Sequence, residues 1–240
     1  MKLLAFDTST DLISIAITRS VAGQTQLWEH SGPGGALASS ALIPAIEALM
    51  AQAGLRYEEL DAIAFGQGPG SFTGLRTACA VAQGLAFGAG LRVLPVDTLL
   101  ALAEQARFEH LGQTPACRVL ALLDARMDEL YAASYEFESG LWSQNGDHQL
   151  VNPDNLTLGN SQILVGNVFS TYGDRLPQSP EMQPDLPRLH ALPSAAAMLR
   201  LAPALLAAGH AVDPALALPR YIRDKVAKTT RERAAEKAST

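Results

Sequence analysis

Apolar and polar positions alternate at the start of the chain and predict a run of strands. The segments "LLAFDTS" and "LISIAIT" carry apolar residues at every second position or as a buried run, and "QTQLWEH" follows them. We expect three consecutive strands joined by short turns. The loop "SGPGGALAS" ends this part of the pattern.

Helical spacing of apolar residues begins after this loop. The segment "SALIPAIEALMAQAG" predicts a helix that ends at Gly54, and "SFTGLRTACAVAQGLAFGAG" predicts a second helix opened by Ser71 or Thr73. A buried strand, "LDAIAFG", lies between them. "RVLPV" predicts a further strand, and "DTLLALAEQARF" a helix capped by Asp97 or Thr98.

The second half of the chain repeats the pattern of the first. In "KLLAFDTSTDLISIAI" a strand leads to Asp7, a gap, Asp11 and a second strand, and "VLALLDARMDELYAASY" has the same order with Asp124 and Asp128. Both aspartates recur after 117 positions, which suggests an internal duplication. We therefore predict a first domain over residues 1–110, a second over 111–228 and a disordered basic tail over 229–240. The late segment "DPALALPRYIRD" is expected to return to the body of the protein.

Charge and composition narrow the possible classes of function. Of the 240 residues, 48% are hydrophobic and 18% charged, which is typical of a globular protein. The net charge is −6, but residues 219–240 hold seven basic and three acidic side chains, so they carry +4 and the rest −10. An acidic body repels nucleic acid phosphates, so another protein or the tail would have to carry any RNA contact. A solvated end is the other interpretation of the tail.

Membrane, secretion and metal signals are weak in the sequence. No apolar run reaches the roughly 18 residues of a membrane helix, and the first ten residues suit a strand better than a signal peptide. Cys79 and Cys117 fit no disulfide or metal pattern, which favours two thiols in a reducing cytoplasm. The five histidines show no i, i+4 pair, and no nucleophile lies beside a histidine in the sequence. We expect no metal and no catalytic residue.

The loop "GPGSFTGLR", Gly68 to Arg76, is the main candidate for chemistry. It lacks the Gly-Lys-Ser/Thr of a Walker A loop, the spacing of a dinucleotide fingerprint and the GxSxG of a nucleophile elbow. A glycine-rich turn before a helix can bind an anion, or it can serve only as a tight connection. Asp7 can likewise hold a Mg²⁺–nucleotide or stabilise a turn. The candidate nucleotide contacts are Asp7, Gly68, Gly70 and Ser71.

Two helices are candidates for partner contacts. The second carries small residues at helical spacing, Gly74, Ala78 and Ala82, which allow close approach of another helix. The first carries apolar residues on one face, at Leu42, Ile46 and Leu49. These six residues form either an interface or the face that packs on the chain's own sheet.

Several segments together resemble one protein family. "LLAFDTST", "AFGQGPGSFTGLRTACAVAQGLA", "LPVDTLLALA", "LALLDARMDELYAASY" and "PRYIRD" are similar to the TsaB (YeaZ) family, over Met1 to about Lys228. This family is the non-catalytic subunit of the bacterial machinery for threonylcarbamoyladenosine in tRNA. The resemblance implies an α/β fold of the actin/Hsp70/sugar-kinase (ASKHA) type with two duplicated domains. Many members carry a histidine shortly before the first helix, where this chain has "GGALASSALIP", so no role for it is transferred.

The resemblance also implies partners. It predicts a heterodimer with the catalytic relative TsaD, cooperation with the small ATPase TsaE, a homodimer when the chain is alone, and tRNA contact only through the complex in the cytoplasm. No tightly bound cofactor is expected, although weak ATP or ADP contact in the complex remains open. The alternatives are a nucleotide-dependent phosphotransferase of the same fold and a glycoprotease-like peptidase.

Overall fold

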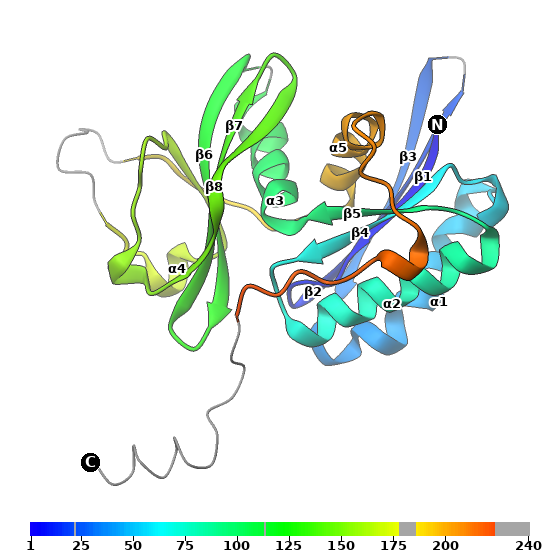
Figure 1. Cartoon of the computed structure of the whole chain (residues 1–240), viewed down its shortest axis with the longest axis horizontal. Helices are drawn as coiled ribbons and strands as arrows, with labels where there is room; N and C mark the ends of the chain where they lie inside the picture. Colours follow the sequence, from blue (N-terminus) through cyan, green and yellow to red (C-terminus); the bar gives the residue numbers. More distant parts are fainter. Residues whose placement is uncertain (22, 113, 178–185, 224–240) are drawn as a thin grey trace, which may run out of the picture.

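Two five-stranded sheets form the framework of the protein. The computed structural model describes residues 1–21, 23–112, 114–177 and 186–223. The predicted disordered tail, 229–240, lies outside the described residues. Figure 1 shows the two sheets as separate lobes, with helices on both faces of each.

The first sheet has the strand order β3-β2-β1-β4-β5. Its strands are β1 (Lys2–Asp7), β2 (Leu12–Val21), β3 (Gln24–Pro33), β4 (Ala62–Gly68) and β5 (Val93–Asp97). The first three strands are antiparallel neighbours, whereas β1, β4 and β5 run parallel. The three consecutive N-terminal strands predicted from alternation are therefore confirmed.

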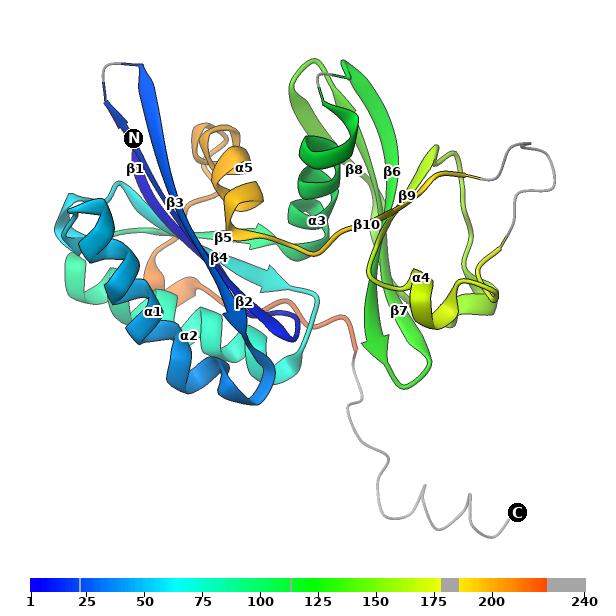
Figure 2. The ribbon, with the colours of Figure 1, turned by 180° about the vertical axis from the view of Figure 1, so that it is seen from behind.

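Alternating side chains of this sheet build two different cores. Leu4 and Phe6 of β1 face the helices α1 (Ala38–Ala53) and α2 (Phe72–Ala89), whereas Leu3 and Ala5 face α5 (Ala195–Ala207). Because successive residues of a strand point to opposite faces, one strand serves both cores. Figure 2 shows α1 and α2 side by side on one face, with α5 on the other.

The helix boundaries follow the capping signals in the sequence. α1 ends at Gly54, whose φ of 62° is left-handed, and α2 begins after Ser71, whose hydroxyl accepts from the Gly74 amide. Asp97 caps the helix α3 (Thr98–Ala106) by accepting from the Leu99 amide at 2.9 Å. Gly35–Ala53 is the one described helical stretch long and apolar enough to cross a membrane, and its Leu42 and Ile46 are buried against the first sheet.

The second sheet repeats the topology of the first. Its order is β10-β9-β6-β7-β8, formed by β6 (Ala116–Arg126), β7 (Glu129–Glu138), β8 (Leu141–Val151), β9 (Ile163–Gly166) and β10 (Arg188–His190). β6, β7 and β8 are antiparallel neighbours, and β9 and β10 run parallel beside β6. α3 covers one face and the short helix α4 (Phe169–Tyr172) the other. The predicted duplicated α/β fold with two domains is confirmed.

The two domains exchange helices, so the predicted division at residue 110 does not follow the packing. The predicted division assigns α3 to the first domain, but its Leu99, Leu102 and Ala103 pack with Val119 and Ala121 of the second sheet. It assigns α5 to the second domain, but α5 packs on β1, β2 and β4 of the first. Sequence order alone cannot reveal this exchange. In the sequence α3 follows the strands of the first sheet and α5 follows those of the second, but each helix packs on the other sheet.

Candidate functional site

The glycine-rich loop after β4 packs tightly against the turn between β1 and β2. The Ser71 amide donates to the Ser9 carbonyl at 2.7 Å, and the Thr8 hydroxyl donates to the Gly74 carbonyl at 2.7 Å. A Cβ atom on Gly70 would lie 2.6 Å from the Ser9 Cβ, and one on Gly74 would lie 1.8 Å from the Thr8 carbonyl oxygen. These two glycines are therefore needed for contact between the turn and the start of α2.

Asp7 is enclosed beneath this loop. Its side chain is 1% exposed, and Oδ1 accepts from the Ser9 amide at 2.9 Å and from the Ser9 hydroxyl at 2.6 Å. Burial raises the pKa of Asp7 above its ordinary value, against the lowering effect of the bonds from Ser9. Oδ2 faces Gly66, where a Cβ atom would meet it at 1.8 Å. Asp7 thus has the surroundings of a turn-stabilising carboxyl group and not of a solvated metal ligand.

A cleft of about 290 Å³ separates the two domains beside the loop. Gly70 and Ser71 line it from the first domain, and Asp124, Arg126 and Asn167 line it from the second. Of the four predicted nucleotide contacts, Gly70 and Ser71 therefore lie at the cleft. Asp7 does not line it, and Gly68 is covered.

Gly68 is covered by residues 218–223, which we call the closing segment. A Cβ atom on Gly68 would lie 2.7 Å from the Arg220 carbonyl oxygen, so this backbone lies directly on the glycine. The closing segment supplies Arg220, Tyr221, Ile222 and Arg223 to the lining of the cleft. The sequence pattern correctly predicted that "PRYIRD" returns to the body, but it gave no sign that these side chains enter the cleft.

The second aspartate hairpin faces the loop across the cleft. Asp124 Oδ1 accepts from the Arg126 amide at 2.8 Å and from the Tyr172 hydroxyl at 3.2 Å. Asn167 accepts from the Asp124 amide at 2.9 Å. Sequence reasoning found Asp124 from the repeat but missed Arg126 and Asn167, which no motif marks.

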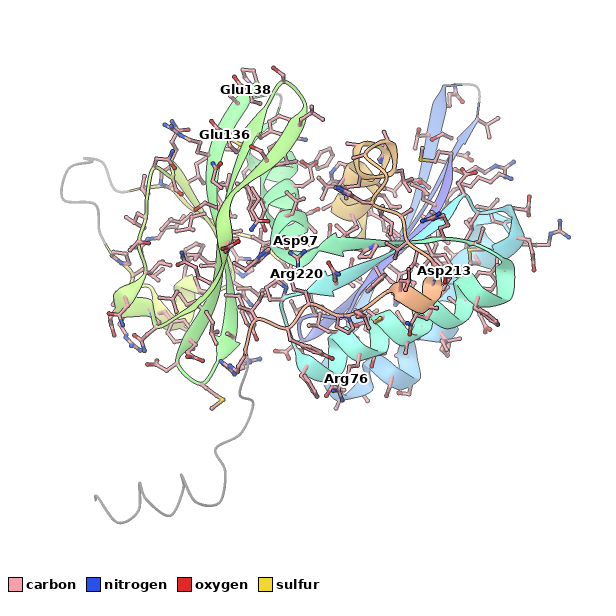
Figure 3. The ribbon with its side chains drawn as sticks, viewed as in Figure 1. Arg76, Asp97, Glu136, Glu138, Asp213 and Arg220 are labelled. Atoms are coloured by element: carbon pink, nitrogen blue, oxygen red, sulfur yellow. The ribbon has the colours of Figure 1, made fainter. Side chains whose placement is uncertain are left out.

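A buried polar cluster joins the two domains behind the cleft. Asp97 Oδ2 accepts from the Tyr135 hydroxyl at 2.9 Å and lies 2.7 Å from His148 Nε2 and 3.3 Å from Arg220 Nη1. The side chains of Asp97 and His148 are 12% and 8% exposed. Figure 3 shows Asp97 and Arg220 close together between the two lobes. The sequence indicated Asp97 only as a helix cap.

The six residues predicted at a partner interface lie in the core instead. All six residues are buried: Leu42, Ile46, Leu49, Gly74, Ala78 and Ala82. They pack around Leu4, Phe6 and Ile63 of the first sheet, apart from Gly74, which lies against Thr8. This corrects the prediction: small residues at helical spacing let α2 approach its own sheet closely.

No group of three or more His, Cys, Asp or Glu side chains in the described part of the chain is arranged to hold a metal ion. Cys79 and Cys117 are buried free thiols in this part, and burial raises the pKa of both.

The comparisons with known proteins agree with the duplicated fold. A protein-family model described as "TsaD: tRNA N6-adenosine threonylcarbamoyltransferase" matches residues 36–231. The tRNA threonylcarbamoyladenosine biosynthesis protein TsaB of Escherichia coli is 32% identical over 95% of this chain and 96% of its own length. TsaB of Haemophilus influenzae is 32% identical over 94% and 95%. The chain belongs to the TsaB family.

A solved structure supports the same assignment. YeaZ from Pseudomonas aeruginosa is 36% identical, with a TM-score of 0.79 over 92% of this chain and 99% of its own. The resemblance of the sequence motifs to the TsaB (YeaZ) family is thereby confirmed. The TsaB relatives of Escherichia coli and Haemophilus influenzae match this chain almost end to end.

Proposed function

We propose that this chain is a non-catalytic subunit that supports a TsaD-type transferase in making threonylcarbamoyladenosine in tRNA. The observation that carries the proposal is the similarity to TsaB relatives over almost the full length of both chains. The loop that would bind phosphate is packed against the chain's own β1–β2 turn and closing segment, and this packing favours a non-catalytic role. We place this activity in the cytoplasm, with TsaE as the ATPase of the assembly.

The proposal also covers nucleotide binding and contact with tRNA. Gly70 and Ser71 lie at the cleft and can offer weak contact to ATP or ADP within the complex, whereas Asp7 and Gly68 are occupied by internal contacts. We propose no tightly bound cofactor. The excess of acidic residues outside the basic end of the chain favours tRNA contact through partner proteins.

The outward face of α1 and α2 is the proposed contact surface for the partner, and for a second copy when the chain is alone. On α1 this face carries Ile43, 42% exposed, and on α2 it carries Phe87, 83% exposed. Ala80 and Gly84 are exposed on α2, and nothing lies within 4 Å of a Cβ atom built on Gly84. Exposed apolar groups beside small residues suit a close helix contact, since each Å² of apolar surface buried contributes roughly 25 cal/mol before association costs.

Reconstitution of tRNA modification tests the proposal. The chain is mixed with TsaD, TsaE and the remaining proteins of the pathway from the same source, and modified adenosine in tRNA is measured by nucleoside analysis. We expect strong loss when this chain is omitted and no modification by the chain alone. Gly84→Arg should reduce both modification and TsaD binding, and Gln26→Arg on the exposed part of β3 is the control of equal charge.

Two outcomes would overturn parts of the proposal. Full modification in the absence of this chain would remove it from the pathway. Turnover of ATP, a phosphate acceptor or a peptide by the purified chain would favour the phosphotransferase or the peptidase over a non-catalytic subunit.

A further inference from the structure

The closing segment is docked on the first domain by its first four residues. The Arg220 amide donates to the Gln67 carbonyl at 2.8 Å, and the Gln67 side chain donates to the Leu218 carbonyl at 3.1 Å. The Tyr221 ring lies 5.3 Å from the Phe72 ring, and its hydroxyl accepts from Arg76 Nε at 3.0 Å. These contacts tie it to the end of β4 and the first turns of α2.

The last two residues of the closing segment are docked on the second domain. Arg223 donates to Glu129 Oε2 at 2.6 Å and to the Arg126 carbonyl at 3.2 Å. Ile222 packs against the core between α3 and the second sheet. Six residues therefore bridge the two domains, and Figure 1 shows the segment crossing from beside α2 toward the second sheet.

Arg220 connects the middle of the closing segment to the buried polar cluster. Its Nη1 lies 3.3 Å from Asp97 Oδ2, and that oxygen also accepts from Tyr135 of β7. Asp97 belongs to the first sheet and Tyr135 to the second. Arg220 therefore forms its ion pair with a carboxylate that already contacts both domains. Hydrogen bonds to ionised groups in a largely buried setting are the stronger ones.

Asp11 and Arg126 form a further ion pair, between side chains that line the cleft from the two domains. These side chains are 78% and 68% exposed, so the pair contributes little to holding the domains together. The closing segment makes two partly buried ion pairs, Arg220 with Asp97 and Arg223 with Glu129, together with backbone bonds and aromatic packing. These contacts link the two domains more strongly than the exposed pair of Asp11 and Arg126 does.

We propose that the closing segment is an intramolecular clamp that fixes the two domains in one relative orientation and holds the cleft between them narrow. Because the clamp rests on Phe72 and Arg76, it also fixes α2 relative to the second domain. The inference rests on contacts within one chain and does not depend on the identity of any partner.

Distances between the domains test the clamp. Spin labels on Glu58→Cys and Glu138→Cys, exposed positions in the first and second domains, report the domain orientation by pulsed electron resonance. In the full-length chain, Tyr221→Ala with Arg223→Gln should broaden the distance distribution and shift it to longer values. Amide exchange at Arg220 should rise roughly tenfold or more. The control, Arg188→Gln, removes an exposed arginine that donates to the Gly173 carbonyl within the second domain, and it should change neither readout.

An unchanged distance distribution together with faster exchange would mean that the segment detaches without moving the domains, and this would overturn the clamp. Should the double variant fail to fold, Arg223→Gln alone detaches the second-domain end and is measured in the same way. An additional comparison uses chains ending at Arg223 and at Ala217. The clamp requires the longer one to keep the distances of the full chain and the shorter one to lose them.

Discussion

Asp7 and Asp124 make the same hydrogen bond in the two domains. Each Oδ1 accepts from the amide two residues ahead, Ser9 at 2.9 Å and Arg126 at 2.8 Å, at the end of the first strand of its sheet. The internal repeat therefore extends from strand order to a single turn contact. The surroundings have diverged: Asp7 is enclosed, whereas Asp124 also lies 3.4 Å from Arg126 Nη1 at the cleft.

The enclosed carboxyl of Asp7 should make stability depend on pH. Because burial raises its pKa above the ordinary 3.8, the neutral form is favoured by folding. Its stabilising contribution is full below the ordinary value and is lost as the pH rises through the raised value. The unfolding free energy of Asp7→Asn, relative to the unmodified chain, should thus increase from pH 4 to pH 8 in urea titrations.

Asp7→Ala separates the hydrogen bond from the charge. Without an acceptor for the Ser9 amide and hydroxyl, the variant should lose about 1–3 kcal/mol of unfolding free energy. A difference between Asp7→Asn and the unmodified chain that stays constant with pH would contradict the role assigned to this carboxyl.

Gly74 and Gly84 lie in the same helix and should respond oppositely to alanine. A Cβ atom at position 74 would collide with the Thr8 carbonyl at 1.8 Å, so Gly74→Ala should separate α2 from the β1–β2 turn and severely destabilise the protein. Nothing lies within 4 Å of a Cβ atom built at position 84, so Gly84→Ala should raise the free energy of unfolding by up to about 1 kcal/mol. Thermal unfolding monitored by circular dichroism measures both. Equal effects would show that helix propensity, and not contact with Thr8, decides the need for Gly74.

The helices and strands of this fold can be predicted from the sequence, but the long-range contacts that assemble the candidate site cannot. Caps such as Ser71 and Gly54 act within a few residues, so they mark helix ends correctly. The meeting of Asp97, His148 and Arg220 depends on how the two sheets and the closing segment pack, because these partners lie up to 123 positions apart in the sequence. No short-range pattern carries that information.

The small residues of α2 illustrate a second limit. Gly and Ala at helical spacing permit close packing on either side of a helix, and the spacing does not say which neighbour is near. Here the closely packed neighbours are the first sheet and the β1–β2 turn, through Ala78, Ala82 and Gly74. The duplicated fold was predictable because the repeat of Asp7 and Asp11 at Asp124 and Asp128 recorded it directly.

Glutamate substitutions at positions 80 and 82 of α2 distinguish the outward face of the helix from its core face. Ala82 is fully buried, so Ala82→Glu places a carboxylate in the core without a partner and should prevent folding or cost more than about 3 kcal/mol. Ala80 is exposed, so Ala80→Glu should remain folded and weaken association with a second copy or with TsaD. Circular dichroism and light scattering measure the two effects. A folded Ala82→Glu chain with unchanged stability would refute the placement of this face.

Glu104 is the buried charge that joins the exchanged helices, and its removal should weaken the whole molecule. This side chain is 3% exposed and accepts from Arg107 at 2.8 and 3.0 Å, from Arg200 of α5 at 2.9 Å and from Trp142 of β8 at 3.0 Å. Burial acts to raise its pKa, but the bonds from Arg107, Trp142 and Arg200 outweigh this effect and hold the pKa below its ordinary value.

Removing Glu104 leaves two arginines without their carboxylate partner, so Glu104→Ala should lower the unfolding free energy by about 3 kcal/mol at pH 7. The stabilisation is present above the ordinary pKa of 4.5 and is lost as the pH falls through the lowered value, so the difference from the unmodified chain should shrink toward pH 3. Glu138→Ala, at an exposed position of β7, is the control and should change the value by no more than about 0.5 kcal/mol. Urea unfolding at pH 7 and pH 3 decides the question. A Glu104→Ala chain as stable as the control at pH 7 would mean that α3 and α5 are held together by apolar packing alone.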